Sequence, residues 1–269
     1  MSANIFRHEW RARQRSVIVW SLAVAAVIFI FLSFFSGFAD QAGLINEMMA
    51  RFPPEMRAAF GLNDMDLTTV LGYYSFVFLF VQLCLAIQAG NYGFGLVSIE
   101  ESELTADFLL SKPVSRGQVL TSKLLAALTA LVVTGLVLSV SSLVSISLFR
   151  NGRDYDAQTL LLLLLSTVIF QLFFLGVGLL VSLLVRRVRS VTPYSLGLGF
   201  GAYILIAFSG LFGDVKLELI TPFKHLDAAR IVHQGAFDTP LVLINVAVTV
   251  VCVAVSYWLY IRRDIPAVS

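Results

Sequence analysis

Residues 100–116 read "EESELTADFLLSKPVSR" and separate two long apolar runs, Tyr73–Leu96 and Leu120–Leu148. The stretch carries four carboxylates, two basic side chains and a proline in a chain that is otherwise mostly apolar. An α-helix needs about 20 apolar residues to cross the hydrocarbon core of a bilayer. Two such runs on either side of a charged connection predict two membrane-spanning helices joined by a segment in water.

The composition of the whole chain agrees with this interpretation. Hydrophobic residues make up 58% of the 269 residues and charged residues only 13%, whereas soluble domains carry about 25% charged residues. The mean hydropathy is +0.86, and a net charge of +2 gives no indication of a nucleic-acid partner. We therefore expect an all-α, polytopic membrane protein that forms one transmembrane domain over residues 1–269.

Cysteine and histidine usage does not predict a metal or disulfide site. Cys84 and Cys252 lie deep in apolar runs without C-x-x-C spacing, so we expect them to be small buried hydrophobic side chains. The three histidines are scattered along the chain. No cofactor is expected to bind to this chain.

Six apolar runs are long enough to span a bilayer. No small-residue cleavage site follows the first run, so we interpret it as a retained span rather than a secretory signal. The six predicted spans are Val17–Phe35, Tyr73–Leu96, Leu120–Leu148, Leu160–Val185, Tyr194–Phe212 and Leu241–Ile261.

The distribution of basic residues predicts the orientation of these spans, because loops on the cytoplasmic side carry an excess of Lys and Arg. One set of segments, which includes both ends of the chain and residues 97–118, holds twelve of the 19 basic residues. The opposite set holds the other seven, spread over longer loops. Both termini and the charged stretch are therefore predicted to be cytoplasmic.

Several local signals predict shorter helices. A threonine followed by proline occurs at Thr192, Thr221 and Thr239 and predicts a helix start at each position. The second of these would begin a short helix that ends near Gly235. The first outer loop mixes apolar and charged residues around Pro53 and Pro54, and predicts short amphipathic helices at the outer interface.

The sequence lacks the motifs of several enzyme classes. It has no G-x-x-x-x-G-K-[ST] phosphate loop and no H-E-x-x-H, so nucleotide hydrolysis by this chain is not expected. The predicted spans hold essentially no ionisable residues, which disfavours an ion or proton pathway. Their amides, notably Gln82, Gln88 and Gln171, are interpreted as partners in hydrogen bonds between helices.

A pair of glycines in the fifth run has the spacing of close helix contacts. Gly197 and Gly201 form G-x-x-x-G, and small residues let helix backbones approach each other in lipid. Packing inside the bundle and a seam between two copies of the chain are both open for this pair.

The charged stretch itself predicts a short helix. Ser98 and Glu101 have capping-box spacing, so a helix is expected to begin as the chain leaves the second span. Pro113 is expected to end it, and the next helix to start near Ser115 and continue into the third span. A helix that only rests on lipid would favour basic residues on its polar face, whereas this one is mostly acidic. We therefore expect it to dock against a protein.

The segment resembles one found after the second span of ABC exporter permeases of the type-2 class, which carry a pattern close to E-E-x-x-G-T-x-x-x-L-L-S-x-P-V-S-R and a later lysine. Leu104 stands where that family usually has glycine. The resemblance also covers the lead-in "FRHEWRARQRS", the outer segment "PPEMRAAFG" and the six-span layout. The matching residues are Glu100, Glu101, Thr105, Leu109, Leu110, Ser111, Pro113, Val114, Ser115, Arg116 and Lys123.

This resemblance implies a permease subunit of the prokaryotic cytoplasmic membrane without ATPase activity of its own. It would pair with a second copy or a close relative, and with two cytoplasmic ATP-binding subunits that hold ATP and magnesium. Residues 97–118 would be the coupling segment that seats on the ATPase, with Phe108 or Leu109 filling a pocket. Residues 1–15 would form an amphipathic helix along the inner interface.

Two other functions stay open from the sequence alone. One is a six-span secondary carrier or channel, which the lack of charges in the spans and of internal inverted repeats disfavours. The other is a membrane anchor or sensor that partners an ATPase without transport. The transported substrate is not indicated by any motif.

Overall fold

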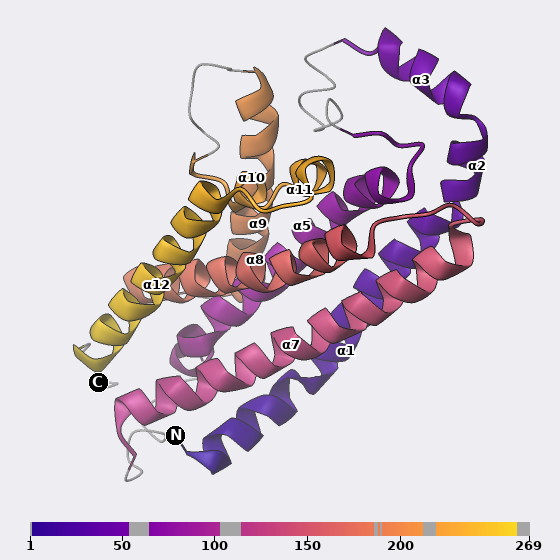
Figure 1. The fold of residues 1–269 in the computed structure, drawn as a ribbon. Helices are drawn as coiled ribbons and strands as arrows, with labels where there is room; N and C mark the ends of the chain where they lie inside the picture. The colour runs from indigo at the N-terminus through magenta and orange to yellow at the C-terminus, as the bar shows by residue number, and fades with distance from the viewer. Residues whose placement is uncertain are drawn as a thin grey trace.

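The structure is a computed structural model, and it describes residues 2–53, 65–102, 114–185, 188, 190–211 and 219–262 (Figure 1). The regular secondary structure of these residues is helical. Six helices are long: α1 (Ala3–Ser33), α5 (Val70–Ser102), α7 (Arg116–Phe149), α8 (Ala157–Leu184), α9 (Val191–Leu211) and α12 (Thr239–Arg262). Four are short: α2 (Phe35–Asp40), α3 (Ala42–Arg51), α10 (Pro222–His225) and α11 (Ala228–Gln234).

Five helices, α1, α5, α7, α8 and α12, are long and apolar enough to cross a membrane. The prediction of an all-α membrane protein is therefore confirmed. The fifth predicted run lies in α9, whose apolar part within the described residues, Val191–Ile206, is shorter than a typical span. The structure thus supports five of the six predicted spans by length and composition.

The bundle is built around α5. This helix packs closely against α8 and α9, α12 covers α8, and α1 runs beside α7 (Figure 1). Glycines permit the close contact between α5 and α8: a Cβ on Gly93 would lie 2.4 Å from the Leu175 carbonyl oxygen, and one on Gly178 would lie 3.0 Å from the Gly90 carbonyl oxygen. Most of the α5 side chains are buried, which agrees with a central position.

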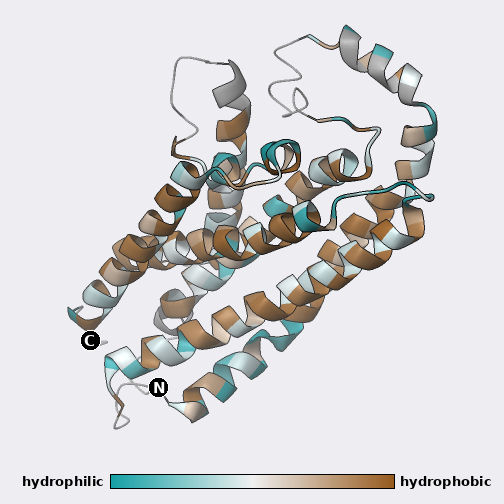
Figure 2. Cartoon of the chain, viewed as in Figure 1, coloured by the Kyte–Doolittle hydropathy of each residue, from teal (hydrophilic) through white to brown (hydrophobic). Residues whose placement is uncertain are grey.

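The two ends of the bundle carry different elements. The N-terminus, the last turn of α12, the end of α5 and the start of α7 lie at one end, while α2, α3, α10 and α11 lie toward the other (Figure 1). We call these the terminal end and the loop end. The long helices between them are mostly apolar, and hydrophilic residues concentrate toward the ends (Figure 2).

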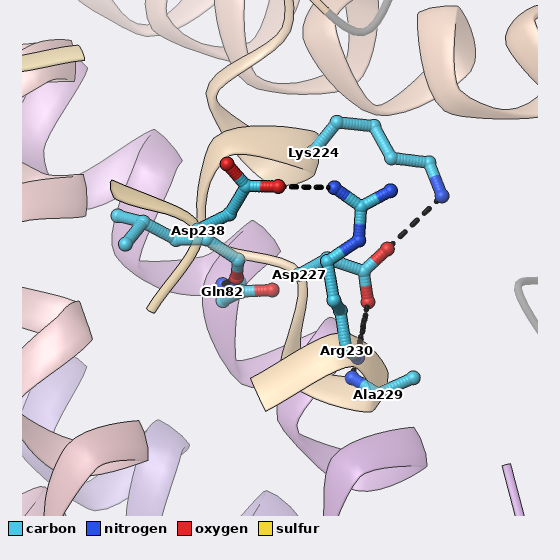
Figure 3. A network of polar contacts seen from close by, with 7 residues as sticks. Gln82, Lys224, Asp227, Ala229, Arg230 and Asp238 are labelled. Carbon is cyan, nitrogen blue, oxygen red and sulfur yellow. Dashed lines mark hydrogen bonds and ion pairs between the residues drawn. The ribbon is translucent and has the colours of Figure 1, made fainter. Parts of the chain in front are cut away.

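Ion pairs and a cap order the loop end between α9 and α12 (Figure 3). Asp227 accepts hydrogen bonds from the first amides of α11 and pairs with Lys224 at 3.0 Å. Arg230 pairs with Asp238 at 2.7 Å, and the Gln82 amide of α5 donates to the Leu226 carbonyl oxygen at 2.9 Å. The predicted single helix from Thr221 to Gly235 is therefore two helices, because Asp227 caps a second one.

Other local predictions have mixed outcomes. Thr221 is the N-cap of α10 with Pro222 in its first turn, as predicted, but Thr192 and Thr239 lie inside the first turns of α9 and α12. Short helices do follow the first span, as α2 and α3, whereas residues 54–64 lie outside the described part. The lead-in over residues 3–15 is not a separate helix, because α1 continues without a break from Ala3 to Ser33.

The predicted helix start at Ser98 is wrong. Ser98 lies inside α5, and its hydroxyl donates to the Phe94 carbonyl oxygen at 2.5 Å instead of capping a new helix. The apolar side chains around it favour continuation of the helix, and its buried hydroxyl is satisfied by the turn before it. The polar stretch therefore begins as an extension of α5.

Candidate functional site

The charged connection lies between the end of α5 and the capped start of α7. α5 continues to Ser102, and α7 begins at Arg116 with Ser115 as its N-cap. The Ser115 hydroxyl accepts from the Gln118 amide at 3.3 Å, and the Gln118 side chain accepts from the Ser115 amide at 3.2 Å. This capping box confirms the predicted helix start near Ser115.

The predicted site residues are distributed unevenly over the described part of the chain. Glu100 and Glu101 belong to the last turns of α5, and Ser115 and Arg116 open α7. The remaining members of the set lie between residues 103 and 113, outside the described residues, namely Thr105, Phe108, Leu109 and Pro113. The structure therefore places both ends of the predicted segment at the terminal end of the bundle.

A buried lysine ties these ends together. Lys123 lies two turns into α7 with only 2% of its surface exposed, and its Nζ donates to the Leu96 carbonyl oxygen of α5 at 2.7 Å. The same Nζ lies 3.8 Å from the Glu9 carboxylate of α1. The ammonium group of this α7 residue thus contacts both α5 and α1, close to the end of α5 and the start of α7.

Glu9 and a second cation complete this contact. The Arg13 guanidinium binds the Glu9 carboxylate one turn along α1, and both side chains are largely buried, at 9% and 15% exposed. The Ser2 amide donates to the Ser122 hydroxyl of α7 at 2.8 Å. We call Glu9, Arg13 and Lys123 the three-helix pin, because they join α1, α5 and α7.

The three-helix pin also compensates the buried charges of its own members. Taking a charge out of water costs several kcal/mol unless an opposite charge and hydrogen bonds compensate it. Glu9 faces both cations, and the Leu96 carbonyl supplies a further acceptor. A shift of α5 relative to α1 would separate these groups, so the pin makes the relative positions of the helices interdependent.

Sequence reasoning did not identify the pin. Lys123 was assigned to the basic segments near span ends, and the spans were expected to hold essentially no ionisable residue. The structure corrects this expectation, because Lys123 lies inside the third predicted run and is buried. The available signals were a lysine within an apolar run and a glutamate four residues before an arginine, at Glu9 and Arg13.

Deeper in the bundle, amides and hydroxyls link four helices. Gln88 of α5 donates to Thr134 of α7 at 2.8 Å and to Tyr92 at 3.4 Å, and Tyr92 donates to Ser16 of α1 at 3.1 Å. Gln171 of α8 donates to the Gln88 oxygen at 3.4 Å. The interpretation of Gln88 and Gln171 as partners in hydrogen bonds between helices is confirmed.

Gly197 and Gly201 do not pack inside the protomer. Both lie on an exposed side of α9, and a Cβ at either position would meet no atom of the described residues within 4 Å. The glycine of α9 that faces the bundle is Gly199, whose Cβ would lie 2.9 Å from the Ile87 side chain. Among the described residues, neither glycine of the predicted pair has a packing partner inside the protomer, and a seam between two copies stays a prediction.

Apolar helices of spanning length, buried polar contacts between them and a charged connection at one end define a polytopic helical membrane protein. Within the described ranges, no group of three His, Cys, Asp or Glu side chains could hold a metal ion. The chain belongs to the ABC-2 family of transporter proteins, whose family model matches residues 3–265. Membership implies a membrane permease that works with an ATP-binding partner subunit. A comparison with curated proteins finds no match.

Proposed function

We propose that this chain is the permease subunit of an ABC exporter and moves a substrate out across the cytoplasmic membrane with ATP hydrolysed by a separate subunit. Family membership carries the proposal. A partner that holds the nucleotide and magnesium is in keeping with the lack of a phosphate-loop motif in this sequence. The working assembly holds two permease chains with six spans each and two ATP-binding subunits. Both termini face the cytoplasm.

Coupling requires contacts that differ between the states of the ATPase, because a ligand shifts an equilibrium only through differential interaction. The connection from α5 to α7 is suited to this task. It leaves the bundle at the terminal end and is joined at both sides to long helices that the three-helix pin ties to α1. A displacement of the end of α5 or the start of α7 would thereby be transmitted to three helices.

The proposed roles within the coupling segment follow from side-chain chemistry. Glu100 and Glu101 face basic groups of the ATPase, where charges mainly tune association and its salt dependence. Phe108 or Leu109 fills a pocket, and truncation of such an apolar anchor typically costs about 2 kcal/mol or more. Thr105 and Pro113 shape the segment between the two helices.

Arg116 has a different role in this proposal. It is the first residue of α7, directly after the Ser115 cap, and we expect it to fix the angle between α7 and the coupling segment. Replacing Arg116 should leave the ATPase subunit bound but reduce the transmission of its conformational change to the membrane helices.

The test is isolation of the tagged chain from its native membrane, identification of a co-purifying phosphate-loop ATPase, and reconstitution of the complex in vesicles. We expect ATP-dependent transport, loss of ATPase co-purification in Phe108→Ala, and ATP hydrolysis without transport in Arg116→Ala. Phe34→Ala, an exposed phenylalanine just after α1, is the matched control and should change neither readout.

Two results would contradict the proposal. Normal complex and normal transport in both variants would show that the segment is not the coupling element. A stable complex that hydrolyses ATP but transports none of a broad panel of amphipathic compounds, peptides and ions would favour an anchor or sensor role instead.

A further inference from the structure

Three arginines form a stripe along the first turns of α1. Arg7, Arg11 and Arg15 follow one another at four-residue spacing, and each is exposed. Residues four apart lie on the same side of a helix, so the three guanidinium groups share one face. Within the described part of the chain they make no ion pair or hydrogen bond, in contrast to Arg13, which points inward to Glu9.

The same face of α1 continues as its lipid-exposed side. Ile18, Leu22 and Phe29 are exposed at 58%, 65% and 49%. At about 100° per residue, these three positions fall on the side that carries the arginines. Because α1 is one unbroken helix from Ala3 to Ser33, the arginine stripe and the apolar stripe keep a fixed relative rotation.

Figure 2 shows the corresponding change along α1, from hydrophilic residues in its early turns to hydrophobic residues further on. A helix rises about 1.5 Å per residue, so Arg15 lies about 4.5 Å before Ile18 along the axis, and Arg7 a further 12 Å or so. The polar layer of a bilayer is about 5–8 Å thick on each side. Arg15 thus lies within the headgroup layer, Arg11 lies a few Å outside it, and Arg7 lies about 10 Å outside it.

We infer that Arg7, Arg11 and Arg15 bind the phosphates of anionic phospholipids in the leaflet at the terminal end of the bundle. The planar guanidinium donates paired hydrogen bonds to phosphate oxygens, and anionic lipids attract basic residues beside a span. Such contacts set the depth and the rotation of α1, and therefore the position of Glu9 on its opposite side. The inference rests on the membrane-spanning fold and not on the direction or energy source of transport.

An acidic surface of a partner protein is the other anion that this stripe could meet. The position of the stripe disfavours it, because the side of α1 that faces α7 is the one that carries Glu9, 3.8 Å from Lys123, and Arg13, which binds Glu9. The stripe lies on the opposite side of α1 and continues directly into the lipid-exposed surface. Lipid phosphate is the anion available on that side.

The experiment measures which lipids the full chain retains. The purified protein is placed in nanodiscs of phosphatidylcholine with a minor fraction of phosphatidylglycerol, and the ratio of the two lipids that stay bound is read by native mass spectrometry. We expect enrichment of phosphatidylglycerol that declines with salt. At about fivefold in affinity for each basic residue near an anionic surface, replacing all three arginines with glutamine should weaken the enrichment by up to about 100-fold.

Two comparison variants sharpen the test. Replacing the three arginines with lysine keeps the charge and should retain most of the enrichment, which separates loss of binding from loss of folding. Arg51→Gln removes an exposed charge from α3 toward the loop end and should leave the ratio unchanged. Equal enrichment in the wild type and the triple glutamine variant would overturn the inference. Unchanged lipid retention with weaker ATPase co-purification would overturn it in favour of a protein partner.

Discussion

The substitution Glu9→Gln tests the three-helix pin most directly. It removes the carboxylate that faces both Arg13 and Lys123, whose side chains are 9% and 2% exposed, and leaves two cations with little access to water. Removing one partner of a buried ion pair costs about 3–5 kcal/mol. Since Glu9 keeps 15% of its surface exposed, we expect a loss in free energy of unfolding near the lower value, about 3 kcal/mol.

A double-mutant cycle with Lys123→Met measures the coupling between the charges. In the wild-type background this change removes the ammonium hydrogen bond to Leu96, and a hydrogen bond to a charged group contributes about 1.5–3 kcal/mol. In the Glu9→Gln background, Lys123→Met also removes one of the two buried cations that lack the carboxylate. This gain offsets the lost hydrogen bond, so the free-energy cost of Lys123→Met should fall below about 1 kcal/mol. The interaction energy should then be at least about 0.5 kcal/mol, within the range for residues in direct contact.

The assay is equilibrium unfolding in detergent micelles with increasing dodecyl sulfate, followed by tryptophan fluorescence, for which Trp10 lies next to Glu9 in the sequence. Glu47→Gln is the matched control, since Glu47 pairs with Arg51 four residues on but both are mostly exposed. It should change stability by less than about 1 kcal/mol. Equal losses for Glu9→Gln and Glu47→Gln, or additive energies in the cycle, would refute the buried pin.

Three further predictions address packing, orientation and pH. Gly93→Ala should destabilise the α5–α8 contact by about 1–3 kcal/mol in the same unfolding assay, whereas Gly201→Ala should change stability little because its Cβ meets open space; equal effects would contradict the close approach. In a chain without its native cysteines, Asp154→Cys should react with an impermeant thiol reagent in intact cells and Gln118→Cys should not, and the reverse pattern would invert the orientation. The Thr159 hydroxyl and the Gln158 amide hydrogen-bond Asp156 and lower its pKa below the usual 3.8. The stabilisation that the ionised Asp156 cap gives α8 should therefore be fully present above pH 3.8 and fade as the pH falls through the lowered pKa. The difference in free energy of unfolding between the wild type and Asp156→Ala should then shrink on acidification. A constant difference would contradict this.

The positions of the long helices could be read from local composition. Burial of about 20 apolar residues in hydrocarbon is favourable wherever such a run occurs, so hydropathy alone places α1, α5, α7, α8 and α12. The start of α7 was equally local, because the Ser115 cap depends on residues within one turn. Local reasoning failed at Ser98, where the same residue type lies inside a helix. A serine hydroxyl can cap a helix or bond to the preceding turn, and the surrounding apolar residues decide between these two.

Contacts between helices that are distant in sequence could not be predicted from local sequence patterns. Glu9 and Lys123 are separated by more than a hundred residues, and only the pairing of α1 with α7 brings their charges together. The G-x-x-x-G pair of α9 is a second case in which local spacing did not predict the contacts between helices. Its spacing matched close helix packing, but the rotation of α9 turns Gly199 toward α5 and leaves Gly197 and Gly201 exposed.

The sequence by itself therefore determined that the chain is a helical membrane protein and where its charged connection lies, because transfer of each segment into a bilayer depends mainly on that segment's own residues. The tertiary structure decided which side of each helix is buried and which charges are paired. Those outcomes depend on how the helices fit together, as the glycine contacts of α5 with α8 and the Lys123 contact across three helices show. A side chain's role in this protein follows from the helix it faces as much as from its own chemistry.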